Sequence, residues 1–164
     1  MKVLAIDPGF GRCGVAVLIG TGSSATLLYS SCIETSNKDN FSLRLLTVGN
    51  EVSRIIKEFE PDTIAVEELY FTNNAKTALR VAEVRGMLIY LAGSLGITLV
   101  EYNPLSIKIA LTGYGRASKE QVMKMVEKLI KFPEKKMLDD EYDAIALGLT
   151  ALAGAKYNEV RSRK

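Results

Sequence analysis

The sequence predicts an α/β protein built on one five-stranded mixed sheet with helices on both faces. About the first 35 residues contain three short runs rich in Val, Ile and Leu, and the Gly and Ser turns between them are typical of hairpins. The rest of the chain alternates helical and strand-like patterns, which favours parallel strands joined by helices. At 164 residues and 48% hydrophobic composition, the chain is long enough to bury one core. We expect a single domain over residues 1–155 and a basic tail over residues 156–164.

Apolar periodicity and turn residues predict the successive strands and helices. The hairpin strands are expected at "KVLAID", "GVAVLIG" and "ATLLYSSCIET". A helix follows over "NFSLRLLTVGNEVSRIIKEFE", and Pro61 stops it. Two further strands, "DTIAVEEL" and "ITLVEY", are separated by a long helix that runs from an Asn cap to Gly96. An amphipathic helix, "SKEQVMKMVEKLI", and an acidic one, "MLDDEYDAIALGLTALAGAKY", complete the chain.

The composition excludes several kinds of chemistry. The chain has no histidine, which removes the usual general base and the commonest zinc ligand. Hydrolysis would therefore depend on carboxylates and lysines. The N-terminal "MKVLAID" has no secretion-signal pattern, and no apolar run reaches membrane-spanning length. We expect a cytoplasmic protein with no membrane partner.

Three aspartates stand at the start of the C-terminal helix, although the rest of that helix is mostly apolar. The helix dipole favours acidic residues in a first turn, which accounts for one or two of Asp139, Asp140 and Asp143. Asp143 lies one turn after Asp140 and beside the apolar Ile145, so both carboxylates project from one face. Two like charges near a core are costly unless a cation joins them.

Carboxylates also interrupt two strands that are otherwise apolar. Asp7 ends "LAID" before Pro-Gly, and Glu67 and Glu68 end "IAVEE". Because side chains alternate along a strand, only one of the two glutamates shares a face with Asp7. We choose Glu67, which follows the apolar run directly. We expect Glu68 to face solvent or to support the site residues from behind without joining them.

Four oxygen donors then converge from two strands and one helix: Asp7, Glu67, Asp140 and Asp143. Such a set suits Mg²⁺, for which we expect Mn²⁺ to substitute. Two ions about 4 Å apart would clamp the attacking and leaving oxygens of a phosphodiester and draw the nucleophile from bound water. A purely structural role is the alternative for each acidic residue at a strand end, and their joint occurrence favours the metal site.

Positive charge is concentrated in one segment. Residues 104–136 contain eight Lys or Arg against three Asp or Glu, a net charge of +5, whereas the whole chain carries +2. A nucleic-acid-binding surface and a solvated helix face both explain such a run.

The ordered motifs resemble those of the RuvC-type Holliday junction resolvases, members of the RNase H-like superfamily, over residues 1 to about 155. "IDPGFGRCG" is similar to the family's first-strand motif, "VEELYFTNNAKTALRVAEVRG" to its second acidic strand and long helix, and "DDEYDAIALGL" to its final motif. The resemblance implies an RNase H-like fold and an endonuclease that cuts two opposed strands of a four-way DNA junction in recombination and repair. It also implies that the catalytic, metal-binding carboxylates are Asp7, Glu67, Asp140 and Asp143, the set that charge burial selects.

The resemblance further implies residues that contact DNA. The family's lysines fall on Lys108 and Lys119 in the basic segment, and Lys119 joins the catalytic set. We add Arg116 within "GYGRASKE", where two glycines before a Ser-capped helix would bring backbone N–H groups to a phosphate. The family's aromatic residue that enters the junction falls on Tyr70, with Phe71 beside it. One of the two rings alternatively closes the core, and we assign that role to Phe71.

Small residues recur about one turn apart along one side of the long helix, which permits close approach of another backbone. This stripe comprises Ala75, Ala78, Ala82, Gly86 and Gly93. Packing on the parent sheet is one explanation. The family's dimerisation through this helix implies instead a two-fold homodimer, which presents two sites to two strands. The branch-migration proteins RuvA and RuvB are further partners that the resemblance implies.

Three other functions share parts of the pattern. "AIDPGFGRCGVAV" also resembles the phosphate loop of actin-like ATPases and sugar kinases, although those folds need two such domains. A YqgF-type nuclease has a similar first motif, but the "DDEYDA" ending favours the RuvC type. A module that binds branched DNA without cutting it would not need all four carboxylates.

Overall fold

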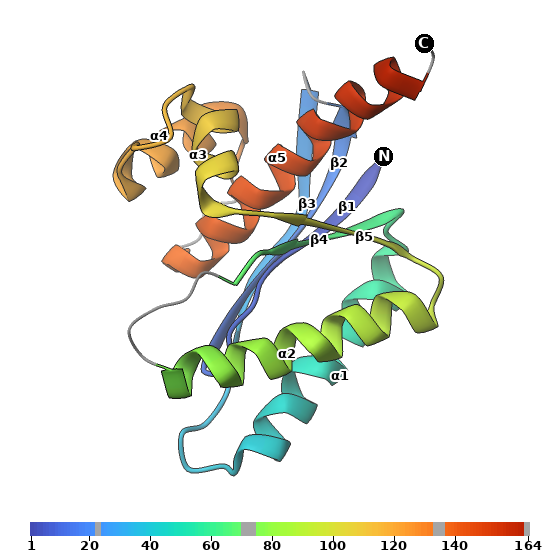
Figure 1. Cartoon of the computed structure of the whole chain (residues 1–164), viewed down its shortest axis with the longest axis vertical. Helices are drawn as coiled ribbons and strands as arrows, with labels where there is room; N and C mark the ends of the chain where they lie inside the picture. The colour runs from blue at the N-terminus through green and yellow to red at the C-terminus, as the bar shows by residue number, and fades with distance from the viewer. Residues whose placement is uncertain (22–23, 70–74, 133–136, 163–164) are drawn as a thin grey trace.

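Figure 1 shows the computed structural model of the chain, in which a twisted sheet lies between two layers of helices. The structure describes residues 1–21, 24–69, 75–132 and 137–162, with the backbone alone for residues 75 and 156–162. The strands are β1 (Lys2–Asp7), β2 (Arg12–Thr21), β3 (Ser24–Glu34), β4 (Thr63–Glu67) and β5 (Thr98–Tyr102), in the order β3-β2-β1-β4-β5. β1, β2 and β3 are antiparallel, and β4 and β5 run parallel to β1. The predicted mixed sheet of five strands is confirmed.

β1 lies at the centre of the sheet because both of its faces are apolar. Residues 3–6 are completely buried. Val3 and Ala5 belong to the hydrophobic core on one side of the sheet, whereas Leu4 and Ile6 belong to the core on the other side. A strand that is apolar on both faces requires helices on both faces, as the sequence predicted.

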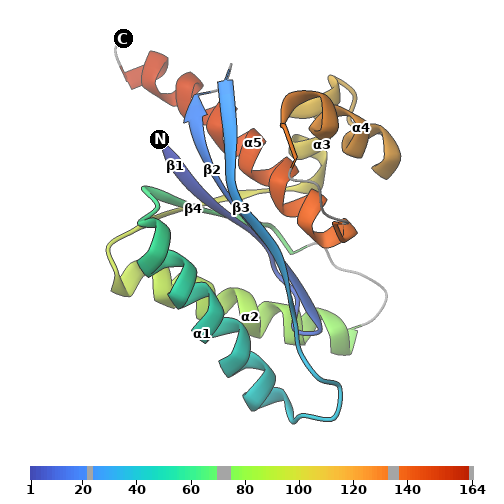
Figure 2. The same cartoon turned by 180° about the vertical axis from the view of Figure 1, so that it is seen from behind.

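α1 (Phe41–Phe59) and α2 (Ala75–Ser94) cover one face of the sheet (Figure 2). The side chain of Asn40 caps α1 by accepting a hydrogen bond from the Leu43 N–H at 3.0 Å. α1 ends before Glu60, which has a left-handed φ of 46° and precedes Pro61. The predicted Asn cap of α2 lies outside the described residues.

α3 (Pro104–Thr112), α4 (Lys119–Leu129) and α5 (Asp139–Ser162) cover the opposite face (Figure 1). Ser118 and Gln121 form a reciprocal capping box that starts α4. α5 continues past residue 155, and the division between domain and tail stays a prediction. Within the described ranges, no helix combines the length and apolar character needed to cross a bilayer.

α5 approaches the sheet closely because two glycines leave room for it. A Cβ atom on Gly14 would lie 2.0 Å from the backbone oxygen of Asp140, and one on Gly148 would lie 2.3 Å from Cδ1 of Leu18. Gly14 pairs with Asp7 across the β1–β2 ladder. The first turn of α5 therefore lies over the end of β1.

Candidate active site

Asp7 and Glu67 end two neighbouring parallel strands. The register of β1 and β4 pairs Ile6 with Val66, and each carboxylate is the next residue along its strand. Because the two strands are in phase at this point, both side chains emerge on the same face. The structure therefore brings together the two strand carboxylates that alternation selected.

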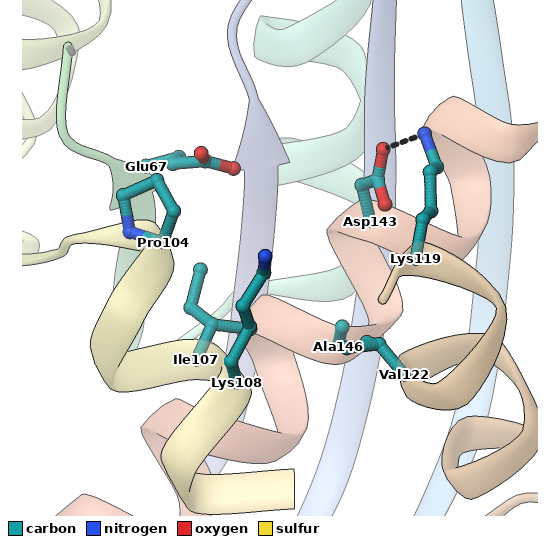
Figure 3. A pocket seen from close by; sticks show the side chains of 8 residues that line it. All are labelled: Glu67, Pro104, Ile107, Lys108, Lys119, Val122, Asp143 and Ala146. Carbon is teal, nitrogen blue, oxygen red and sulfur yellow. Dashed lines mark hydrogen bonds and ion pairs between the residues drawn. The ribbon is translucent and has the colours of Figure 1, made fainter. Parts of the chain in front are cut away.

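Asp140 and Asp143 reach the same place from α5. The backbone of Asp140 rests on Gly14, the residue paired with Asp7. One turn later, Asp143 lines a hollow together with Glu67, Lys108 and Lys119 (Figure 3). The four carboxylates thus approach one another from β1, β4 and α5.

The electrostatics of this cluster are unfavourable without an added cation. Burial, together with the charges of Glu67, Asp143 and Asp140, raises the pKa of Asp7 to about 7. Burial and the charge of Asp143 also raise the pKa of Glu67 to about 7. Burial raises the pKa of Asp140, against the lowering effect of Arg12. Each of these carboxylates is costly to ionise in the presence of the others.

Two cationic side chains partly balance the cluster. The Lys119 ammonium donates hydrogen bonds to Oδ2 of Asp143 at 2.7 Å and to Oδ2 of Asp139 at 3.3 Å. On the other side, the Arg12 guanidinium lies 3.2 Å from Oδ2 of Asp140 and 3.6 Å from Oδ1 of Asp139. Asp139 is therefore a bridge between the two cations.

The donor chemistry of the site fits a hard divalent cation. All four converging side chains are carboxylates, the ligand type that Mg²⁺ and Mn²⁺ prefer. Oδ2 of Asp140 is buried and accepts no hydrogen bond, although Nε of Arg12 lies 3.2 Å away. In the conformation described, no set of three or more Asp, Glu, Cys or His among the described residues has metal-binding geometry. Since Lys119 and Arg12 draw Asp143 and Asp140 toward themselves, metal binding would require these ion pairs to rearrange.

The other residues implicated by the sequence lie in different places. The Lys108 ammonium points into the space between Glu67 and Asp143 (Figure 3). Arg116 is exposed in the turn between α3 and α4, and it forms no ion pair within the described part of the chain. Glu68 is half-buried and lines a second hollow with Asp7 and Glu67. Tyr70 and Phe71 fall outside the described residues.

Sequence reasoning missed three residues around the site. Arg12 and Asp139 form the ion pairs described above, and Arg12 begins β2 directly after the loop that follows Asp7. Glu141 is 5% exposed and accepts hydrogen bonds from Ser30 on β3 at 2.9 Å and from the Leu138 N–H at 3.3 Å. These bonds fix the first turn of α5 to the sheet. In the sequence, Arg12 could have been found from its charge at the start of a strand, and Glu141 from its position in a helix that is otherwise mostly apolar.

A five-stranded sheet of this order, with carboxylates at two strand ends and on a helix packed above them, is the architecture of the RNase H-like nucleases. The family model described as crossover junction endodeoxyribonuclease RuvC matches residues 3–151. The chain belongs to the RuvC family.

Individual relatives agree with this assignment. A crossover junction endodeoxyribonuclease RuvC from Finegoldia magna is 40% identical over 164 residues, which is 100% of both chains. The structure of T. thermophilus RuvC in complex with Holliday junction substrate has a TM-score of 0.90 at 30% identity and covers 96% of each chain. The yeast mitochondrial Holliday junction resolvase Ydc2 shares the fold, with a TM-score of 0.71 at 15% identity over 99% of this chain and 84% of that one. Membership of the RuvC family excludes the kinase, ATPase and YqgF-type alternatives.

Proposed function

We propose that this protein resolves four-way DNA junctions in recombination and repair by hydrolysing one phosphodiester bond in each of two opposed strands. The observation that carries the proposal is the convergence of Asp7, Glu67, Asp140 and Asp143 at one edge of the sheet, beside Lys108 and Lys119. A relative that covers almost the whole chain has been solved with a Holliday junction, which supports the same substrate here.

The four carboxylates would hold divalent cations, Mg²⁺ with Mn²⁺ as a substitute, and two ions per site are proposed. When bound, the ions supply the charge that activates water and stabilises the leaving oxygen. Asp7 and Glu67 are set by paired strands, and Asp140 and Asp143 by a helix packed on the sheet. The ligands therefore stand on rigid elements, which favours preorganisation.

Lys119 is the proposed catalytic cation. Its ammonium lies at the rim of the carboxylate cluster, where it would steady the scissile phosphate. Lys108 and Arg116 are proposed to contact the phosphate backbone on the same side of the site. Stacking of Tyr70 or Phe71 on unpaired bases remains a prediction of the family resemblance.

We further propose a homodimer formed through α2. The inward face of this helix buries Val84, Leu88 and Ala92 in the core, while its outward face leaves Leu79 66% and Tyr90 76% exposed. On the same helix, Ala82, Gly86 and Gly93 are small and exposed. A Cβ atom on Gly86 or on Gly93 would meet no atom within 4 Å. Ala82, Gly86 and Gly93 thus face away from the parent sheet, where a second copy can pack against them.

A two-fold dimer would present two sites to two strands of like polarity, as paired cleavage requires. Contact with the branch-migration proteins RuvA and RuvB is proposed from the family resemblance. Cytoplasmic location is proposed as the compartment that fits the proposed action on recombining DNA.

Cleavage of a labelled mobile four-way junction, compared with a linear duplex of the same sequence, tests the function. We expect symmetrically related cuts in opposed strands of the junction, dependent on Mg²⁺, and an intact duplex. Equal cutting of junction and duplex would indicate a nuclease without junction specificity. Binding of the junction without cutting in Mg²⁺ or Mn²⁺ would contradict the enzymatic proposal.

A further inference from the structure

Three hollows follow one another along the carboxyl ends of β1 and β4. The first, between Glu67 and Lys119, shares Glu67 with the second, which runs from Asp7 to Thr77. The second shares Thr77 with a third hollow of about 540 Å³, between the loop after Asp7 and the first turns of α1 and α2. The active site therefore continues into a groove that ends well away from α3 and α4.

We propose that this third hollow binds the phosphate backbone of a DNA arm, on the side of the scissile phosphate opposite to Lys108 and Lys119. The inference rests on the proposed junction-cleaving function and assigns a further part of its substrate contact. Three cations line the hollow: Arg44, Lys76 and Arg80. Fixed cations that contact phosphates set the position and register of DNA on a protein.

Arg44 is held in place by its neighbours while much of its binding capacity stays free. Its Nε donates a hydrogen bond to Oγ1 of Thr35 at 2.8 Å, and its guanidinium lies 4.7 Å from the centre of the Phe10 ring. Arg44 forms no ion pair with any described carboxylate. A guanidinium that is ordered but lacks a carboxylate is suited to bind a phosphate oxygen.

The same contacts connect Arg44 to the catalytic strand. The hydroxyl of Thr35 donates to the backbone oxygen of Phe10, and the Thr35 N–H donates to the Gly11 oxygen at 3.0 Å. Phe10 and Gly11 lie in the loop that directly follows Asp7. A phosphate held by Arg44 would thus be positioned relative to Asp7 through few covalent and hydrogen-bonded links.

The other two cations complete the lining. Lys76 is exposed and has no ion-pair partner in the described ranges. The Arg80 guanidinium stacks 4.0 Å from the centre of the Phe41 ring and pairs with Glu83 at 2.9 Å. Glu83 therefore competes with an incoming phosphate for Arg80.

The distribution of charge along the groove explains the need for this hollow. The middle of the groove is acidic, because Asp7, Glu67 and Glu68 line it. Until metal ions neutralise these carboxylates, they repel a polyanion, so cations on one side alone would hold an approaching DNA strand poorly. With Lys108 and Lys119 at one end and the Arg44 hollow at the other, the strand would be held on both sides of the bond to be cut.

Junction binding across a salt titration tests the proposal, in an Asp7→Asn background that prevents cleavage. We expect Lys76→Ala to weaken binding and to reduce the slope of log affinity against log salt by about 0.9, the value for one lost phosphate contact. Glu83→Gln releases Arg80 and should strengthen binding instead. Lys124→Ala, at an exposed position on α4 outside the groove, is the matched control and should leave the slope unchanged.

A second measurement locates the contact on the DNA. Neutral methylphosphonate linkages are placed one at a time along a junction arm. The parent should lose affinity at a short run of positions to one side of the scissile phosphate, and Lys76→Ala should lose less at those same positions. The proposal would be overturned if Lys76→Ala and Glu83→Gln had the same affinities and salt slopes as the control. The proposed function has its own test in the Lys124→Ala protein with Asp7 intact: if that protein failed to cut the junction, the proposed function would be contradicted instead.

Discussion

The backbone oxygen of Asp140 lies directly over Gly14, so closely that a Cβ atom at position 14 would be 2.0 Å away from it. Backbone cannot yield as a flexible side chain can, so a methyl group at this position must push α5 away from β2. The consequence is specific, because the same turn of α5 carries Asp140 and Asp143, two of the proposed metal ligands.

We expect Gly14→Ala to lower the free energy of unfolding by about 1–3 kcal/mol and to reduce junction cleavage in the fraction that remains folded. Chemical denaturation and single-turnover cleavage check both effects. Gly49→Ala is the matched control, since its new Cβ would meet the flexible Met87 side chain at 3.3 Å. A Gly14→Ala protein that unfolds and cuts like the parent would show that α5 does not need this close approach.

Asp7 provides a pH test of the carboxylate cluster. Its ordinary pKa is 3.8, but in the folded chain the pKa is about 7, so between these pH values the folded state holds a proton that the unfolded state has released. In metal-free protein this carboxyl therefore costs stability as the pH rises toward 7. Asp7→Asn removes that cost.

In the presence of a chelator, we expect Asp7→Asn to be more stable than the parent at pH 8, by on the order of 2 kcal/mol, and equally stable near pH 4. Addition of Mg²⁺ should raise the melting temperature of the parent more than that of the variant. Denaturant unfolding at both pH values checks the sign of this stability difference between variant and parent. Equal stability across the whole pH range would mean that Asp7 is not strained by its neighbours.

Asp139 is expected to control how strongly Lys119 competes with metal. Lys119 pairs with both Asp139 and Asp143, so Asp139→Asn leaves its ammonium to Asp143 alone. We expect Asp139→Asn to weaken Mg²⁺ binding by about two- to fivefold when Lys119 is present, and by less in a Lys119→Gln background. Calorimetric titration of Mg²⁺ into the parent, the two single variants and the double variant completes this double-mutant cycle. If Mg²⁺ affinity fell equally in both backgrounds, Asp139 would act on the metal through its own negative charge and not through Lys119.

The α2 surface gives a test of symmetry. We expect Gly86→Glu to produce a folded monomer, because the new carboxylate disrupts close packing of two helices while its Cβ atom meets no atom of its own subunit within 4 Å. Light scattering, a melting curve and the timing of the two cuts report the outcome. Asn50→Glu adds the same charge to an exposed position of α1 and should stay dimeric. If Gly86→Glu also stays dimeric and cuts both strands together, the interface lies elsewhere.

Burial underlies both the predicted strands and helices, which follow the pattern of apolar residues, and the choice of candidate carboxylates, which interrupt that pattern. Burial is costly for a charged group, so Asp7 and Glu67 were conspicuous at the ends of apolar strands, and strand alternation separated Glu67 from Glu68. The sequence left open which way the α2 stripe faces, since both faces of that helix carry apolar residues. The exposure of Gly86 resolves this point in the folded chain.

The ionic and polar network around the site was not predictable from spacing. Arg12 and Asp139 are 127 positions apart and meet only because α5 crosses β2. Glu141 looked like one more acidic residue in a first helical turn, yet its hydrogen bond to Ser30 spans 111 positions. Such contacts depend on how a helix is placed over a sheet, which local patterns do not encode.

Junction cleavage is proposed to require all four carboxylates, and cleavage by their isosteric variants is the decisive measurement. We predict that Asp7→Asn, Glu67→Gln, Asp140→Asn and Asp143→Asn each lower the single-turnover rate on a four-way junction by at least about a hundredfold while junction affinity changes little. Glu68→Gln, the matched control from the same strand end, should cut at close to the parent rate. Near-normal cutting at physiological Mg²⁺ by any two of the four variants would contradict the assignment of the active site.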